Sequence, residues 1–253
     1  AKWGGLGTSP GGPSMQSLSL SRPSLRVVLS IAATLLLVGG CATTKPVNRI
    51  EKLASMGENP RILLMKPDVK LSVLTASGMI EPQAEWTDAA RRNFADAADS
   101  FGKQRKVQVV RMSDDAVLGD EELAYQRLYE AVGATILLHH YGVSKLPTKA
   151  GALDWSMGSG MASIRDKYGA DYALFSFYRD SKSSGGRVAM MVLFAAAGVA
   201  IPGGGQGGYA SLVDLNTGDI VWFNMVAAGA GDLRTPEGAE TAVKQLFSNL
   251  PQS

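Results

Sequence analysis

Apolar residues recur along the chain at helical spacing in four segments. The period of about 3.6 residues predicts helices over 87–101, 120–137, 157–168 and 235–250. In the first we expect Thr87 to cap the start and Gly102 to end the helix. In the second we expect Leu128, Val132 and Ile136 on one side. The last begins with the helix-start pair Thr235 and Pro236.

Short apolar runs between these helices predict strands. They lie at 61–65, 71–74, 107–110, 171–178, 210–215 and 220–223. Pro67 marks an edge or a break between the first two, and the turn residues 216–219 predict a hairpin between the last two. The pattern therefore predicts an α/β (α+β) fold, a single mixed sheet with helices packed on it.

The segment 185–208 departs from this alternation, because Val188 to Ile201 is continuously apolar and a glycine-rich run follows it. Arg187 is the only charged residue in the segment. One interpretation is a buried helix or strand pair in the core. The other is an exposed element that contacts a membrane surface or another subunit. Its contact residues would be Met190, Met191, Val192, Leu193, Phe194, Val199 and Ile201.

The N-terminal region has the order of an export signal. Arg22 and Arg26 precede the apolar run Val27 to Val38, and the first acidic residue of the chain is Glu51. This run is shorter than the roughly 20 apolar residues of a membrane-spanning helix. We expect a signal peptide over 1–40, in which residues 1–14 precede the natural start at Met15.

The apolar run ends in Leu37-Val38-Gly39-Gly40-Cys41, which resembles the lipobox of bacterial lipoproteins. This resemblance implies that Cys41 is acylated and becomes the first residue of the mature protein. Ala42 follows it, and similarity to the Gram-negative sorting rule implies the periplasmic face of the outer membrane. We expect a lipidated tether over 41–59 and a periplasmic α/β domain over 60–253, with 185–208 as an insertion.

Charge and cysteine content exclude two classes of protein. Removal of residues 1–40 leaves 22 basic and 23 acidic residues, a balance that lacks the basic surface needed to bind nucleic acid. Cys41 is the only cysteine, so an intramolecular disulfide is impossible. The expected partners are the membrane, through the lipid, and an envelope protein or further copies of the chain.

The order of the predicted elements resembles a known envelope fold. Tyr168 to Leu174 enters a strand, Leu212 to Trp222 forms a hairpin, and an amphipathic helix closes the domain. This succession is similar to the N-terminal domain of TolB and to the periplasmic domain of curli-secretion lipoproteins. With 178–180 and 185–191, it also resembles a family of Gram-negative lipoproteins of unknown function. The resemblance covers roughly 60–250 and carries over no catalytic residue.

The residues available for catalysis are few. His139 and His140 are the only histidines, and adjacent residues cannot share one face of a helix or strand. The stretch Gly158-Ser159-Gly160 matches no nucleophile or phosphate-loop motif. The carboxylate pairs 114–115 and 121–122 are expected on solvated surfaces. We therefore expect no metal and no cofactor.

These observations favour a non-catalytic, lipid-anchored envelope protein. It would act as a scaffold or accessory in surface assembly, secretion or cell-wall maintenance. The alternative is a periplasmic hydrolase or ligand-binding enzyme, which requires a pocket with titratable groups around His139.

Overall fold

A computed structural model gives the fold, and it describes residues 44–54, 59–105, 107–112 and 118–252. The predicted signal peptide, Cys41 and the pair at 114–115 lie outside the described residues. The strands are β1 (Val47–Asn48), β2 (Arg61–Leu64), β3 (Asp68–Leu74), β4 (Ile80–Pro82), β5 (Gln108–Arg111), β6 (Tyr172–Ser183), β7 (Gln206–Asp214) and β8 (Ile220–Val226). The α-helices are α2 (Ala84–Gln104), α3 (Asp120–Ile136), α4 (Met161–Tyr168), α5 (Gly185–Ala196) and α6 (Pro236–Leu246).

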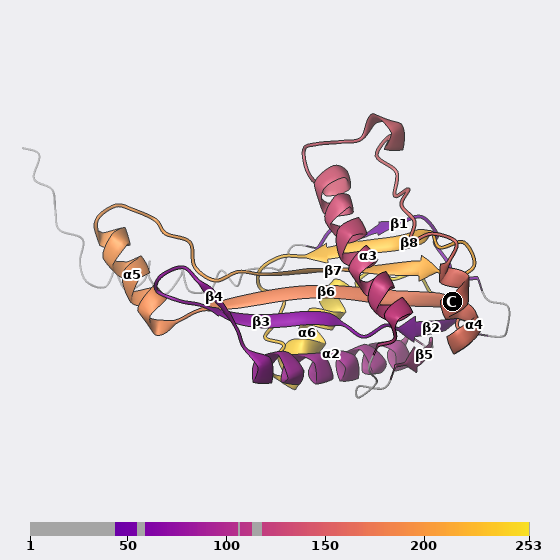
Figure 1. The fold of residues 1–253 in the computed structure, drawn as a ribbon, viewed down its shortest axis with the longest axis horizontal. Helices are drawn as coiled ribbons and strands as arrows, with labels where there is room; N and C mark the ends of the chain where they lie inside the picture. The colour runs from indigo at the N-terminus through magenta and orange to yellow at the C-terminus, as the bar shows by residue number, and fades with distance from the viewer. Residues whose placement is uncertain (1–43, 55–58, 106, 113–117, 253) are drawn as a thin grey trace, which may run out of the picture. The chain divides into compact units, whose positions relative to one another are not determined.

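The strands form one mixed sheet in the order β1-β8-β7-β6-β2-β5, with β3 and β4 attached beside β6. The long strand β6 lies at its centre (Figure 1). The first residues of β6 pair with β2, and residues from Phe177 to Ser183 pair with β3, both in parallel. Pro67 lies between β2 and β3, so the expected break is confirmed and both pieces share one side of β6.

Helices cover both faces of this sheet, which confirms the predicted fold class. On one face α2 and α6 pack together over a core that includes Leu174 and Trp222. On the other, α3 and α4 pack over a core that includes Phe175 and Phe223. Successive side chains of β6 thus pack into the cores on opposite faces of the sheet, because side chains alternate along a strand.

The C-terminal half follows the sequence prediction closely. The hairpin β7–β8 forms around the expected turn, with Gly218 at φ +78°. Thr235 caps α6, where its hydroxyl accepts a hydrogen bond from the backbone N–H of Gly238 at 3.1 Å. The positions expected to face inward, Ala239, Val243, Leu246 and Leu250, are all buried.

The start of α2 differs from the prediction. The helix begins at Ala84 rather than after Thr87, and its N-cap Gln83 makes no side-chain capping bond. Thr87 is buried instead, and its hydroxyl accepts a hydrogen bond from the backbone N–H of Leu71 at 3.0 Å. It thereby joins the helix to β3. The expected end at Gly102 is also wrong, because the helix continues to Gln104. Gly102 lies against Val109, where a Cβ would come within 2.3 Å of a methyl group.

The buried side of α3 is rotated from the predicted one. Leu128 is 40 % exposed, whereas Tyr129, Gly133 and Ile136 are buried. The reason is the aromatic ring of Tyr209 on β7, which lies so close to Gly133 that a Cβ there would clash at 2.1 Å. A glycine in the helix lets the ring approach, and no hydrophobic pattern reveals such a position.

Residues 44–54, within the segment expected to be a tether, contact the sheet. Val47 and Asn48 pair with β8, and the backbone N–H of Lys45 donates to Asn224 at 3.1 Å. Leu53 is buried. Without this segment β8 would be an open edge with unpaired backbone groups, and β1 covers part of it.

Candidate functional site

Strands β6 and β7 continue past the helices that cover the sheet and are joined through α5 at the far end (Figure 1). The turn between β3 and β4 reaches the same end. A Cβ on Gly186 would lie 3.3 Å from the Cβ of Ala76, so the first turn of α5 contacts that turn. We call Met79, Ile80 and residues 185–202 the apolar tip.

Local contacts hold the tip in shape. Ser184 caps α5, accepting a hydrogen bond from the backbone N–H of Arg187 at 3.1 Å. The guanidinium of Arg187 donates to the carbonyl of Pro202, at 3.0 Å from Nε, and so closes the loop that follows the helix. Gly198 ends the helix with φ +77°. The guanidinium of Arg187, the only charged group of 185–208, therefore binds an acceptor within that segment.

The apolar side chains of α5 are turned to solvent. No residue of the helix is buried, and Val192 and Leu193 are 66 % and 65 % exposed. The seven contact residues predicted from the sequence lie on α5 and in the loop after it, with Met190, Met191 and Ile201 half-buried and the others exposed. The interpretation of 188–201 as core is therefore wrong.

Two residues of the apolar tip have no recognisable signal in the sequence. Met79 and Ile80 are 60 % and 65 % exposed at the turn from β3 into β4. They form an apolar pair between Gly78 and Glu81, and so short a run has no periodicity to detect. Only the pairing of β3 with β6 brings them beside α5.

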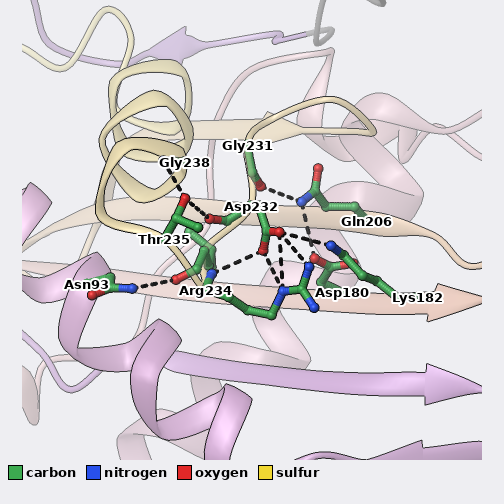
Figure 2. A network of polar contacts seen from close by, with 10 residues as sticks. Asn93, Asp180, Lys182, Gln206, Gly231, Asp232, Arg234, Thr235 and Gly238 are labelled. Carbon is green, nitrogen blue, oxygen red and sulfur yellow. Dashed lines mark hydrogen bonds and ion pairs between the residues drawn. The ribbon is translucent and has the colours of Figure 1, made fainter.

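A polar network lies at the base of the strands that carry the tip (Figure 2). Lys182 of β6 and Arg234 both bind the carboxylate of Asp232, at 2.9 and 2.6 Å. Gln206 of β7 donates to Asp180 at 3.3 Å and to the carbonyl of Gly231. Burial raises the pKa of Asp180. The network joins β6 and β7 to the loop before α6 and fixes the point where the tip-bearing strands leave the core.

The two histidines lie in the last helical turn after α3, Leu137–Tyr141. The Nδ1 of His139 lies 2.7 Å from the carbonyl oxygen of Ser144. The His140 ring packs edge-on against Trp155 with centroids 5.9 Å apart, and burial lowers its pKa. These contacts connect the end of α3 to the following loop.

Glu122 is not on a solvated face, which corrects the expectation for 121–122. Its side chain is 1 % exposed, and Lys167 and Tyr168 of α4 both donate to Oε1, the tyrosine at 2.9 Å. The bond from Lys167 lowers the pKa of the Glu122 carboxyl, against the opposing effect of burial. The group joins α3 to α4. Glu121 remains exposed and accepts a bond from Ser163.

Two further observations concern the described part of the chain alone. There, no cluster of three or more His, Cys, Asp or Glu side chains is arranged to hold a metal ion. Every helix within 44–54, 59–105, 107–112 and 118–252 also falls short of the length and apolar character needed to cross a bilayer.

Comparison with known proteins finds similarity only among solved structures. No protein-family model and no curated protein matches the chain. A PelC dodecamer from Paraburkholderia phytofirmans aligns with 84 % of this chain and 99 % of its own, at 11 % identity and a TM-score of 0.36. Lipoprotein GNA1162 from Neisseria meningitidis aligns with 67 % of this chain and 84 % of its own, at 12 % identity and a TM-score of 0.28. TM-scores below 0.5 do not establish a common fold, and no role is transferred from either protein.

Proposed function

We propose that this chain is a lipid-anchored protein on the periplasmic face of the outer membrane. It acts without catalysis, as a scaffold or accessory in surface assembly, secretion or cell-wall maintenance. In this proposal Cys41 carries the lipid, and the apolar tip makes a second contact with the same membrane.

The observation that carries the proposal is the exposure of α5. A helix that is apolar on all sides is normally buried in a protein core or in lipid. Here Val188, Val192 and Leu193 are 48–66 % exposed, and Met79 and Ile80 add a second apolar element beside them. Hydrocarbon solvates a helix from every side, whereas a protein partner covers one side. The all-round apolar character therefore favours lipid as the occupant.

The start of the described chain supports the same assignment. Thr44 pairs with Val226 of β8. Across the sheet, Val226 pairs with Gly208 of β7, and Gly208 pairs with Tyr178 of β6, so these residues form one row. From that row β6 runs about 17 Å further, at 3.3 Å per residue, to its end at Ser183, two residues before α5 begins. Cys41 precedes Thr44 by three residues, which span at most about 11 Å. The described chain therefore begins at the row from which the strands extend toward the tip, and in this proposal the lipid and the tip contact the same membrane.

Vesicle flotation of the chain from Ala42 to Ser253, which lacks both the export signal and Cys41, tests the tip without the lipid. We expect this chain to float with vesicles of anionic and zwitterionic phospholipid. Serine at Val192, Leu193 and Phe194 should reduce binding at least tenfold, because each buried apolar side chain contributes about 1.5 kcal/mol or more. Leu128, Leu138 and Val143 are exposed apolar residues outside the tip, and serine at those three positions is the matched control.

Equal flotation of the two triple variants would contradict the proposed membrane contact. Analytical sedimentation of the same proteins tests whether the tip binds further copies of the chain instead of lipid. If the chain forms discrete oligomers that only the tip variant disrupts, and does not float, then the tip binds further copies of the chain rather than lipid.

A further inference from the structure

A pocket of about 560 Å³ lies at the base of the strands that carry the apolar tip. It is bounded by β3, by β4 and the start of α2, and by residues 179–181 of β6. This volume falls within the usual range for small-molecule sites, about 300 to 1,000 Å³. The polar network of Figure 2 lies against it, because Asp180 belongs to both.

One part of the pocket is apolar and continuous with the tip. Leu71, Pro82 and Ala84 line it, together with Ile80. Ile80 is 65 % exposed and belongs to the tip as well. An apolar chain can therefore lie against Ile80 and enter the pocket without leaving apolar surface.

Arg91 of α2 also lines the pocket. Its Nε atom is buried and has no hydrogen-bond partner among the described residues. Its ion pair is with the exposed carboxylate of Asp88, at 3.6 Å and one turn away on the same helix. A ligand acceptor that reached this donor would remove the cost of burying it without a partner.

The lining carries two further cations, Lys70 and Arg179, which differ in how tightly they are paired. Lys70 lies 3.8 Å from Asp68 and is 60 % exposed, so its ammonium group is available to a ligand. Arg179 binds the Asp68 carboxylate at 2.8 Å and is already paired. With Arg91 these make three cations, matched in number by the carboxyls of Asp88 and Asp180 in the lining and of Asp68 beside it. Lys70 and Arg91, whose ion pairs are long at 3.8 and 3.6 Å, are the two cations open to an anion.

We infer that this pocket binds an anionic amphiphile, a single acyl chain with an anionic headgroup. The chain lies along Ile80, Pro82 and Leu71, and the headgroup is held by Arg91 and Lys70. This site goes beyond the proposed function, because neither the lipid on Cys41 nor contact of the tip with a membrane requires it.

Isothermal titration of the chain from Ala42 to Ser253, which contains every described helix and strand and carries no acyl chain, tests the inference with three probes. Dodecyl phosphate carries both chain and anion, dodecyl maltoside only the chain, and inorganic phosphate only the anion. We expect dodecyl phosphate, below its micelle concentration, to bind at least tenfold more tightly than either of the others. Arg91→Gln should weaken it about tenfold or more, since a charge-assisted hydrogen bond is lost. Arg92→Gln, an exposed neighbour outside the pocket, should not.

A second pair of variants tests the cavity without removing a charge at Arg91. Ala84→Trp places a large ring at the mouth of the pocket and should also weaken dodecyl phosphate about tenfold. Glu85→Trp, exposed in the same turn of the helix, should leave its affinity unchanged. Binding that neither Arg91→Gln nor Ala84→Trp weakens would overturn the site. If dodecyl maltoside binds as tightly as dodecyl phosphate, the pocket does not recognise an anionic headgroup. If inorganic phosphate binds as tightly, the pocket does not recognise an acyl chain. Absence of dodecyl phosphate binding would overturn the inference as a whole.

Discussion

Glu122 is buried at a position where the sequence pattern predicts an exposed carboxylate. Two acidic residues in the first turn of a helix usually face solvent, where the helix dipole favours them. In this fold α4 lies over the first turn of α3, and Lys167 and Tyr168 of α4 supply the donors that a buried carboxylate requires. Nothing in the sequence around 121–122 indicates which acid is covered, because the partners lie more than forty residues away.

The lowered pKa of Glu122 makes its contribution depend on pH. Above about pH 4.5, the ordinary value for glutamate, the carboxyl is charged in both the folded and the unfolded chain. As the pH falls below that value, the unfolded chain takes up a proton first, so the stabilisation decreases toward the lower pKa of the folded state. We expect Glu122→Gln to reduce the free energy of unfolding by about 1 to 3 kcal/mol at pH 7.

Urea denaturation at pH 7 and at steps down to pH 3.5 measures this contribution. The difference between wild type and Glu122→Gln should be constant above about pH 5.5 and should shrink below pH 4.5. Glu121→Gln, exposed in the same turn, is the matched control and should change stability by less than about 0.5 kcal/mol. A difference that stays the same at every pH would show that Glu122 is not held by the charge of Lys167.

Cys41 carries the lipid in this account, and its replacement has a defined consequence. Cys41→Ala removes the thiol that is acylated, so we expect no incorporation of labelled fatty acid and an accumulation of unprocessed precursor. Metabolic acyl labelling followed by electrophoresis measures both the incorporated fatty acid and the amount of unprocessed precursor. A Cys41→Ala protein that still incorporates label would exclude Cys41 as the acylated residue.

At the scale of elements, the sequence predicts best those whose own residues determine them. Thr235, Pro236 and the inward positions of α6 lie within one helix, and turn residues determine the β7–β8 hairpin. The sequence does not predict the roles of three residues in α2 and α3, because a contact outside the helix determines each role. Thr87 contacts Leu71, Gly102 contacts Val109, and Gly133 contacts Tyr209. The apolar run of α5 permitted two interpretations, and only the topology decides between them.

The docking of α6 can be tested by placing a charge on its inner face. Leu246 is fully buried, so Leu246→Asp buries an unpaired carboxylate at a cost of several kcal/mol. Typical domains have only about 5 to 15 kcal/mol of stability, so thermal melting followed by circular dichroism should show a large fall or no folding transition. Thr241→Asp, exposed on the same helix, should melt close to wild type. Equal melting temperatures for the two variants would mean that α6 does not pack against the sheet.

At the scale of the whole molecule, the sheet would connect the two membrane contacts that we propose. Residues 44–48 run along β8 from the row at which β6 and β7 begin to extend toward the tip. The polar network around Asp232 holds the base of those strands to the loop before α6 (Figure 2). A lipid at Cys41 and an apolar helix at the end of the same strands would hold the domain at two points.

Fluorescence from a dye on the apolar tip tests this two-point attachment most directly. Cys41 is the only cysteine, and in our proposal it is acylated in the processed protein, so Leu193→Cys would provide a single free thiol for an environment-sensitive dye. Val143→Cys, at the fully exposed residue outside the tip, is the control. In lipid vesicles that hold the acylated protein, we predict that the dye at 193 emits at shorter wavelength and is quenched by lipids spin-labelled in the acyl chain. The dye at 143 should do neither. Water-like emission without quenching at both positions would contradict the account.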